Sequence, residues 1–422
     1  MRGTGRLVAG FLFGVALFGT PIAAQTPEQV AAAALKAAPV FDGHNDAPIQ
    51  LRGRYRNILD GFDFEDTHAT GADAPHGRAM HTDLVRLRKG RVGAQFWSVF
   101  VSADLSEPQA VQATLEQIDV TKRLIARYPR DLRLALTAQD VEQAMAKGQI
   151  ASLMGMEGGH SIGSSLAVLR QMQALGVRYL TLTHAKNTPW ADSATDTPAH
   201  GGLTDFGRDV VREMNRLGML VDLAHVSEPT MLDALDVAQA PVIFSHSGAR
   251  AVTDHVRNVP DSVLARLPAN GGIVMAVALP AYISEAARSW QADRKGEQAR
   301  LETLWPGQAD AVAAGLASWD QAHPEPQVTI GQLADHIDHI RKIAGIDHIG
   351  LGGDYDGMPH GPAGMDDVAG YPALFVELAR RGYAQADLEK IASRNILRVM
   401  RAAERYAAAH RGDPPIETPV PD

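Results

Sequence analysis

Residues 39–46 read Pro-Val-Phe-Asp-Gly-His-Asn-Asp, a short apolar run that leads directly into histidine and aspartate. Similar β-rich runs recur along the chain, and the segments between them are long enough to form helices. We find eight such runs, at residues 39–42, 93–101, 151–156, 179–183, 220–224, 242–245, 272–278 and 348–352. Parallel strands require crossover connections of this length, so the pattern predicts an α/β fold built on parallel strands.

The segments between the runs carry a helical periodicity. Apolar residues spaced three and four apart predict amphipathic helices at residues 115–128, 165–175, 205–217 and 330–344. Eight strands with intervening helices favour a closed (β/α)8 TIM-like barrel. An open, doubly wound sheet is the alternative, although no glycine-rich phosphate loop follows the first run.

This rhythm breaks between the seventh and eighth runs. Residues 284–326 are rich in Ala, Arg, Gln and Glu and predict a helical insertion before the last strand. Insertions at the active face of a barrel commonly shape substrate choice. A solvated excursion, a lid over that face and a dimer contact are the three interpretations of the insertion.

The two ends of the chain differ from its middle. Residues 1–24 combine Arg2 and Arg6 with an apolar stretch and small residues at Ala23 and Ala24, which is typical of a cleaved signal peptide. The stretch is shorter than the ~20 residues of a membrane span. We therefore expect an exported protein, periplasmic or secreted, with no stable membrane span after processing. Residues 25–410 are predicted to form a single domain, and the proline-rich residues 411–422 a flexible tail.

Composition narrows the class of partner. The chain has no cysteine, which excludes a disulfide framework and a lipid-anchored lipoprotein. Its net charge is −9, and no cluster of Lys and Arg appears after the leader, so we expect no nucleic-acid partner. Small neutral or zwitterionic substrates fit this composition better.

The residues able to carry chemistry stand where the apolar runs end. In a barrel, catalytic groups come from the ends of several strands at one face, so residues far apart in sequence converge there. A single histidine at a strand end commonly has a structural role. Here six of the eight runs are followed by His, Asp or Glu, namely His44 with Asp46, Glu157, His184, His225, His246 and Asp354. This repetition predicts one shared site.

The types of these residues indicate metal ions. His44 and Asp46 are two residues apart, so in an extended chain both would face the same way and hold one cation together with Glu157. His225, His246 and the other oxygen of Glu157 could hold a second. Zinc accepts this mixture of nitrogen and oxygen ligands. Because two ions bridged by a carboxylate commonly activate water, the strand ends predict a hydrolase.

Several longer motifs carry a resemblance to a known family. They are Asp42-Gly43-His44-Asn45-Asp46, Glu157-Gly158-Gly159-His160-Ser161, Leu180-Thr181-Leu182-Thr183-His184, Asn187-Thr188-Pro189-Trp190-Ala191-Asp192, Ser245-His246-Ser247, Arg257-Asn258-Val259-Pro260 and Gly353-Asp354-Tyr355-Asp356-Gly357. With these motifs the chain resembles the membrane (renal) dipeptidase family, peptidase family M19, from about Phe41 to Glu404. This resemblance implies a barrel of the metal-dependent hydrolase type with two Zn²⁺ per chain, usually a homodimer, that cleaves dipeptides and in some members opens β-lactam rings.

The resemblance also implies the metal ligands. His44 and Asp46 correspond to the ligands of one zinc, and Glu157 corresponds to the bridging carboxylate. His225 and His246 correspond to the ligands of the other zinc. This set is the same as the one indicated by the strand ends.

Substrate-binding and catalytic roles follow from the same resemblance. His184 corresponds to a histidine that donates a hydrogen bond to the scissile carbonyl oxygen. Asp354 corresponds to the acid/base that moves a proton from the attacking water to the leaving amine. Arg257 corresponds to the residue that grips the C-terminal carboxylate, and Tyr282 to a tyrosine that contacts the substrate. A fixed cation for the terminal carboxylate would also measure the length of the peptide.

Four nearby residues leave alternatives open. Arg250 competes with Arg257 but lacks the Asn-Val-Pro context, and Asp356 competes with Asp354 because it lies two residues later. Asp222 is interpreted as a possible buried hydrogen-bonding partner. His160 is interpreted as a residue that orients a neighbour.

Two other functions compete with a dipeptidase. A different barrel hydrolase, such as a lactonase or cyclic amidase, typically has two histidines in its first motif and a lysine as bridge, whereas this chain has Asp46 and Glu157. An exported protein that binds metal or peptide without turnover would lack a catalytic position. The residues therefore favour a zinc-dependent dipeptidase. Dipeptides with a C-terminal D-residue are one candidate class of substrate, and the sequence does not decide between L- and D-residues at that position.

Overall fold

The computed structural model describes residues 1, 5, 25–71 and 78–418. The predicted signal peptide, residues 1–24, lies outside the described residues except for positions 1 and 5, and so do residues 419–422 of the predicted tail. No helix among the described residues is long and apolar enough to cross a membrane.

Eight parallel strands form a closed barrel. They follow the order β2-β1-β9-β8-β7-β6-β5-β4, and the pairing of β2 with β4 closes the ring. Each of the eight predicted runs supplies one strand, which confirms the (β/α)8 prediction. The strands are β1 Val40–Asn45, β2 Val92–Ser98, β4 Ile150–Glu157, β5 Val177–Thr181, β6 Leu220–Asp222, β7 Ile243–Ser247, β8 Ile273–Ala276 and β9 Ile349–Leu351.

A ninth strand, β3 (Leu132–Leu134), was not predicted from the sequence. It pairs in parallel with the first residues of β4, outside the closed ring. With Arg133 at its centre, this strand is too short to show an apolar run. Its conformation is therefore set by pairing with β4 and not by local sequence.

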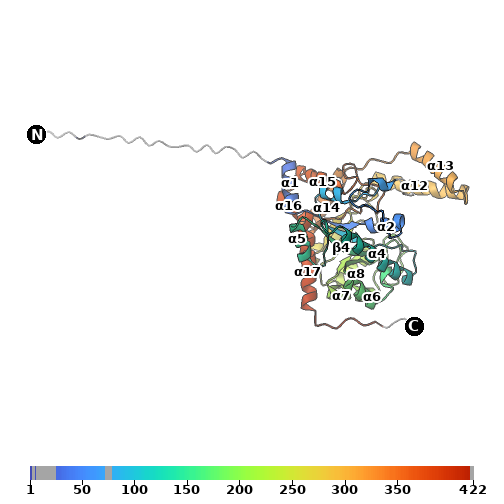
Figure 1. The fold of residues 1–422 in the computed structure, drawn as a ribbon, viewed down its shortest axis with the longest axis horizontal. Helices are drawn as coiled ribbons and strands as arrows, with labels where there is room; N and C mark the ends of the chain where they lie inside the picture. Colours follow the sequence, from blue (N-terminus) through green and yellow to red (C-terminus); the bar gives the residue numbers. More distant parts are fainter. Residues whose placement is uncertain (2–4, 6–24, 72–77, 419–422) are drawn as a thin grey trace.

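Helices connect the strands and surround the barrel (Figure 1). All four predicted helices are present, as α4, α6, α7 and α14. Four of the helices begin at an N-cap residue whose side chain accepts a hydrogen bond from a backbone N–H of the first turn. These residues are Thr26 for α1, Ser165 for α6, Thr204 for α7 and Ser227 for α8. The helices are α1 Pro27–Ala37, α2 Ala47–Tyr55, α3 Leu84–Lys89, α4 Glu107–Arg127, α5 Ala138–Ala146, α6 Leu166–Ala174, α7 Asp205–Leu217, α8 Glu228–Val237, α9 Asp261–Leu264, α10 Leu267–Asn270, α11 Pro280–Ile283, α12 Glu285–Leu304, α13 Ala309–Ala322, α14 Ile330–Ile343, α15 Tyr371–Arg380, α16 Gln385–Glu389 and α17 Asn395–Ala409.

The predicted helical insertion consists of α12 and α13. These helices project as a hairpin beyond one side of the barrel (Figure 1). Only Ala287 and Leu301 of α12 are buried, and α13 has no buried residue. The hairpin is thus anchored mainly through α12.

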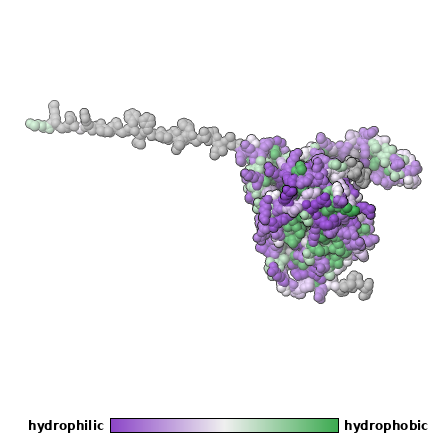
Figure 2. All heavy atoms as spheres, in the orientation of Figure 1, coloured by the Kyte–Doolittle hydropathy of each residue, from purple (hydrophilic) through white to green (hydrophobic). Residues whose placement is uncertain are grey.

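The face of the molecule seen in Figure 2 is largely hydrophilic, and its apolar residues form separate groups.

The strands are buried on both faces, as expected for parallel strands covered by helices. Phe96 contacts Phe41 and Tyr179, with ring centroids 5.4 and 4.8 Å apart. Position 155 must be glycine, because a Cβ there would lie 1.9 Å from Cζ of the Tyr179 ring. This close approach lets the Tyr179 hydroxyl reach His44, which lies at the end of β1.

Candidate metal centre and substrate cavity

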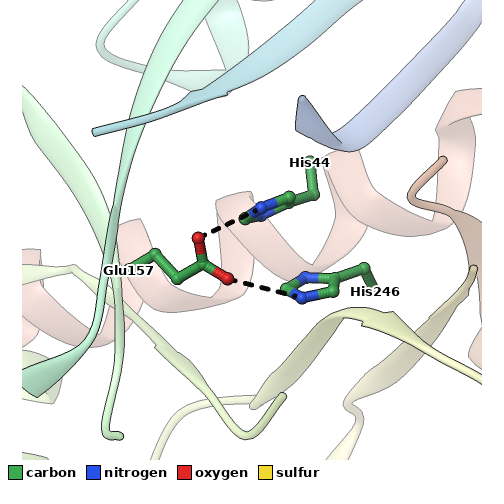
Figure 3. Close-up of side chains that lie close together, drawn as sticks. All are labelled: His44, Glu157 and His246. Carbon is green, nitrogen blue, oxygen red and sulfur yellow. Dashed lines mark ion pairs between the residues drawn. The ribbon is translucent and has the colours of Figure 1, made fainter. Parts of the chain in front are cut away.

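His44 and His246 face opposite oxygens of the Glu157 carboxylate, as Figure 3 shows. Nε2 of His44 lies 3.4 Å from Oε2, and Nε2 of His246 lies 3.5 Å from Oε1. The three residues come from β1, β4 and β7, so the barrel brings together positions that lie far apart in sequence. A carboxylate placed in this way can bridge two cations.

Asp46 and His225 complete the two halves of the cluster. Oδ2 of Asp46 lies 3.3 Å from Nε2 of His44, and Nε2 of His225 lies 3.0 Å from Oε1 of Glu157. The structure therefore brings all five predicted ligands together, with Glu157 between the two pairs. His225 adopts a left-handed backbone with a φ of 68°, which only a tightly packed site tolerates.

The geometry of Asp46 differs from the prediction. The sequence suggested that His44 and Asp46 share one face of an extended strand. Instead β1 ends at Asn45, and Asp46 precedes α2 with φ −97° and ψ 19°, which is not extended backbone. The side chains meet because the chain turns into α2 directly after the strand.

Hydrogen bonds orient both histidines that face the bridge. Nδ1 of His44 lies 2.8 Å from the Tyr179 hydroxyl. Nδ1 of His246 lies 2.8 Å from Oγ of Ser245, and that hydroxyl donates to Asp222 at 2.6 Å. The prediction that Asp222 is a buried hydrogen-bonding partner is confirmed. Because the Ser245 hydroxyl donates to Asp222, it must accept from His246, which places the proton of His246 on Nδ1 and leaves Nε2 for a metal ion. The Tyr179 hydroxyl fixes the orientation of the His44 ring.

Tyr179→Phe removes only the hydroxyl that fixes the His44 ring. We expect the affinity for metal to fall by about 10- to 100-fold, because residues that orient ligands have effects of this size. Competition with a metal indicator dye measures this change. Tyr406→Phe is the control, since Tyr406 stacks on His410 in α17, away from the cluster. Equal affinities in both variants would contradict the orienting role.

The cluster favours a positive charge at its centre. Burial by itself lowers the pKa of His44, but Tyr179, Glu157 and Asp46 outweigh it and raise that pKa well above its ordinary value. Burial raises the pKa of Glu157, yet His44 and His225 hold it well below its ordinary range. Carboxylates that stay ionised in a buried site attract cations.

The donor atoms themselves indicate metal ions. Nε2 of His44 and Oδ1 of Asp46 are buried without a hydrogen-bond partner. Nε2 of His225 lies only 3.0 Å from Nε2 of His246, although both atoms would be lone-pair donors to a metal. Buried polar atoms without partners are rare, and cations between these donors would satisfy them. The residues present therefore fit two divalent ions.

The cluster opens into a cavity of about 370 Å³, which we call the metal cavity. A space of this size suits a small substrate. Its wall includes all four residues predicted to act on the substrate, His184, Asp354, Arg257 and Tyr282. The side chain of His184 lies with Nε2 3.9 Å from Oε1 of Glu157, and its ring contacts those of His225 and Phe100.

Asp354 and Asp356 occupy different surroundings, which separates the two candidates for the acid/base. A carboxylate oxygen of Asp354 lies within 4.8 Å of ligand atoms of His44 and Asp46. Oδ1 of Asp356 instead accepts the backbone N–H of His81 at 2.7 Å. Burial and the charge of Asp46 raise the pKa of Asp354 well above its ordinary value, as a proton carrier requires.

The absence of a side chain at Gly357 leaves room for the carboxylates of Asp354 and Asp46. A Cβ at Gly357 would lie 2.1 Å from Oδ2 of Asp46 and 2.8 Å from Oδ1 of Asp354. Asp354 has a φ of 63°, a left-handed conformation that costs free energy in a non-glycine residue. The Asp354 N–H donates to the carbonyl of His44 at 3.2 Å, which ties it to β1.

Arg257 is a buried cation without a counter-charge. Its side chain is 1% exposed, and Nε and Nη1 have no hydrogen-bond partner. Nη2 donates to the His246 carbonyl at 3.5 Å, and the guanidinium lies 5.4 Å from the centre of the Tyr282 ring. Among the described residues no carboxylate pairs with it. Burying such a charge costs several kcal/mol, so this arrangement indicates a site for an anionic group.

Arg250, the competing arginine, does not line the metal cavity. Nη1 of Arg250 lies 3.0 Å from Oε2 of Glu228 and so already has an anionic partner. Its charge is therefore not available to a ligand. The geometry favours Arg257, as the sequence did.

A buried histidine holds the loop that leads from His246 to Arg257. His336 of α14 is 0% exposed, and its Nδ1 accepts the N–H of Ala249 at 2.9 Å. Burial lowers the pKa of His336 from 6.5 to about 4. Since the folded pKa is depressed, the unfolded chain binds a proton first, and stability is lost as the pH falls from about 6.5 towards 4.

His336→Asn keeps an acceptor for Ala249 but cannot take up a proton. Between pH 7 and pH 5 the wild-type chain should lose about 2 kcal/mol of stability that the variant does not lose. Urea unfolding midpoints at the two pH values measure this difference. A variant whose midpoint falls as far as that of the wild type would rule out His336 as the source.

Some residues in and around the metal cavity gave no signal in the sequence. His81 and His255 stand in polar stretches of the sequence, yet both are partly buried in the structure. Nδ1 of His81 accepts the Asp356 N–H at 3.0 Å, and the His255 ring contacts Tyr282 with centroids 4.3 Å apart. Phe100, which packs on His184, carried no sequence signal. Nε2–H of His160 donates to the carbonyl of Val101 at 3.2 Å, and His160 does not line the metal cavity.

Comparisons with known proteins identify the family of the chain. A family model described as membrane dipeptidase, peptidase family M19, matches residues 28–413. An uncharacterized dipeptidase of Schizosaccharomyces pombe is 42% identical over 406 residues, covering 93% of this chain and 87% of the relative. Human dipeptidase 3 is 40% identical over 396 residues, covering 93% of this chain and 70% of the relative.

Solved structures share the fold. The probable dipeptidase PvdM of Pseudomonas aeruginosa matches with a TM-score of 0.77 and 24% identity, covering 90% of this chain and 99% of that one. A metallopeptidase of Rhodobacter sphaeroides, liganded with a phosphinate mimic of the dipeptide L-Ala-D-Ala, matches with a TM-score of 0.69 and 24% identity. This match covers 87% of this chain and 99% of the chain from R. sphaeroides.

Proposed function

Because the chain belongs to the membrane dipeptidase family, peptidase family M19, and is therefore a metallo-dipeptidase, we propose that it hydrolyses dipeptides with two zinc ions. His44, Asp46 and Glu157 would hold one ion. His225, His246 and the second oxygen of Glu157 would hold the other. When bound, the ions supply the Lewis acidity that activates water and polarises the scissile carbonyl.

The proposed substrate class rests on one observation, which is that the guanidinium of Arg257 is buried in the wall of the metal cavity. A dipeptide has a carboxylate one residue beyond its only peptide bond. If that carboxylate pairs with Arg257, the last peptide bond of the substrate is held beside Glu157, and the small volume of the metal cavity then limits how much chain can precede that bond. A bidentate guanidinium suits this role.

The remaining residues of the cavity have defined parts in the reaction. Burial lowers the pKa of His184, so the ring is neutral and its Nε2–H can donate to the carbonyl oxygen as negative charge develops there. Water attacks the carbonyl carbon, a C–O bond forms and the C–N bond breaks. Asp354 accepts the proton of the water and passes it to the leaving nitrogen. Tyr282 packs beside the substrate carboxylate.

The proposal extends to dipeptides with a C-terminal D-residue. Pairing of Arg257 with the carboxylate depends on the distance from the scissile bond more than on the direction of the side chain. The structural neighbour from R. sphaeroides carries a mimic of L-Ala-D-Ala, which supports testing this class.

A substrate panel tests the proposed function. The purified protein, loaded with zinc, is assayed against L-Ala-L-Ala, L-Ala-D-Ala, trialanine, L-Ala-L-Ala amide and a simple lactone. We expect hydrolysis of both dipeptides and little hydrolysis of the other three. Cleavage of trialanine at the rate of the dipeptides, or of the lactone alone, would contradict the proposal.

We also propose that the protein works after export and as a homodimer. Support for export comes from the signal-peptide features of residues 1–24, and support for the dimer comes from the family resemblance. N-terminal sequencing of the protein from a periplasmic fraction should find a start near residue 25. Light scattering of the purified protein should give twice the chain mass.

A further inference from the structure

A second cavity adjoins the metal cavity. It has a volume of about 490 Å³, and we call it the side cavity. Four residues belong to the walls of both cavities, so the two cavities lie side by side. The shared residues are Ile49, Gln50, Asp356 and Gly357. The rest of the side-cavity wall consists of Gly53, Arg54, Arg78, Ala79, His81, Met358 and Pro359.

The side cavity carries positive charge from Arg54. The Arg54 side chain is half-buried and donates to Oε1 of Gln50 at 2.7 Å and to the carbonyls of Thr70 and Arg78 at 2.9 Å. All of these partners are neutral, and among the described residues no carboxylate pairs with it. These hydrogen bonds hold the guanidinium in place and leave its charge uncompensated. Arg78, an exposed residue whose carbonyl accepts from Arg54, also lines this wall.

Among the residues that the structure describes, Asp356 is the acidic residue of this wall, and one of its carboxylate oxygens is already engaged. The Asp356 side chain is 1% exposed, and its Oδ1 accepts the backbone N–H of His81 at 2.7 Å. The same His81 ring accepts the N–H of Asp356, so two hydrogen bonds fix this carboxylate and its backbone. Asp356 therefore does not reach Arg54 as an ion-pair partner, and the side cavity keeps an excess of positive charge.

The position of Arg257 shows which end of a substrate enters the side cavity. Arg257 and Tyr282 line the metal cavity but not the side cavity. With the C-terminal carboxylate held by Arg257, the scissile bond lies at the metal cluster. The part of the dipeptide that continues toward Ile49 and Gln50 is then its N-terminal residue.

We propose that the side cavity binds the side chain of the substrate's N-terminal residue, and that Arg54 selects an acidic side chain there. The preferred substrates would be dipeptides that begin with glutamate or aspartate. The inference rests on the proposed function, because it assigns specificity to the same reaction. The side cavity is large enough for a long side chain, so charge and not size distinguishes substrates of equal length.

Isosteric substrates isolate the effect of charge. Glu-Ala, Gln-Ala and Lys-Ala have N-terminal side chains of similar length, and kcat/KM is measured for each at low ionic strength. We expect Glu-Ala to exceed Gln-Ala by about tenfold, the factor that corresponds to one charge-assisted interaction. Lys-Ala should be the poorest of the three. The preference for Glu-Ala should shrink as salt is added, because the charges are partly exposed.

Variants then test the assignment to Arg54. In Arg54→Gln the ratio of kcat/KM for Glu-Ala over Gln-Ala should fall close to one. Arg56→Gln is the matched control, because Arg56 lies two residues away, is exposed and does not line the side cavity, and it should keep the wild-type ratio. The ratio is internal to each variant, so it does not depend on the fraction of folded protein. The salt dependence of the wild type gives a second readout if Arg54→Gln does not fold.

The outcomes separate the two proposals. Hydrolysis of Leu-Ala with equal kcat/KM for Glu-Ala and Gln-Ala would overturn the role of Arg54 and leave the dipeptidase activity intact. A preference for Ala-Glu over Ala-Gln in place of Glu-Ala over Gln-Ala would overturn the proposed orientation. Failure to hydrolyse any dipeptide would overturn the proposed function and this inference with it.

Discussion

Asp354→Asn should bind two metal ions as the wild type does and yet lose turnover by about 10²- to 10⁴-fold. Asparagine has nearly the same shape as aspartate but cannot accept the proton of the attacking water. Asp354 follows β9 and lies beside the cluster, but it is not one of the five predicted metal ligands. Its substitution should therefore leave the metal ions bound. Metal content by elemental analysis and kcat for L-Ala-L-Ala measure the two quantities separately.

Asp356→Asn is the matched control for this variant. Asp356 lies two residues later, is equally buried and also has a left-handed backbone, with a φ of 67°. Its amide oxygen could still accept the N–H of His81, so we expect much smaller losses. If Asp354→Asn lost metal along with activity, or if Asp356→Asn lost turnover to the same extent, the assigned role of Asp354 would be wrong.

Arg257→Met should lower kcat/KM for dipeptides by about 10²-fold or more, because a charge-assisted interaction with the terminal carboxylate is lost. Methionine keeps much of the length and fills the apolar surroundings of Tyr282 without adding a buried charge. The more telling readout is a ratio. The wild type should discriminate strongly between L-Ala-L-Ala and its C-terminal amide, whereas Arg257→Met should treat the two almost alike.

Arg250→Met provides the comparison. Arg250 pairs with Glu228 outside the metal cavity, so its loss should leave the discrimination between acid and amide unchanged. A variant of Arg257 that still distinguished the acid from the amide would show that another group reads the carboxylate.

The sequence predicted the architecture because barrel topology makes strand ends informative. His44, Glu157 and His246 are far apart in the chain, but parallel strands place their C-terminal ends at one face. That rule alone brought the predicted ligands together, and the family resemblance is confirmed by the family model and by relatives at about 40% identity. The individual roles of the site residues remain predictions for the variants above.

Other features depend on tertiary contacts that no local pattern records. The strand β3 exists through its pairing with β4, and Asp46 meets His44 through the turn into α2. His81 and His255 looked solvated because their neighbours in sequence are polar. Their actual surroundings are set by Asp356, in the loop after β9, and by Tyr282, in α11.

The account as a whole depends on metal ions held by the cluster around Glu157. The most direct measurement strips the purified protein of metal with a chelator, adds Zn²⁺ in steps, and follows bound metal and hydrolysis of L-Ala-L-Ala in the same samples. We predict no hydrolysis by the stripped protein and a plateau of activity at two equivalents of zinc per chain. Hydrolysis that survives complete removal of metal would contradict the account.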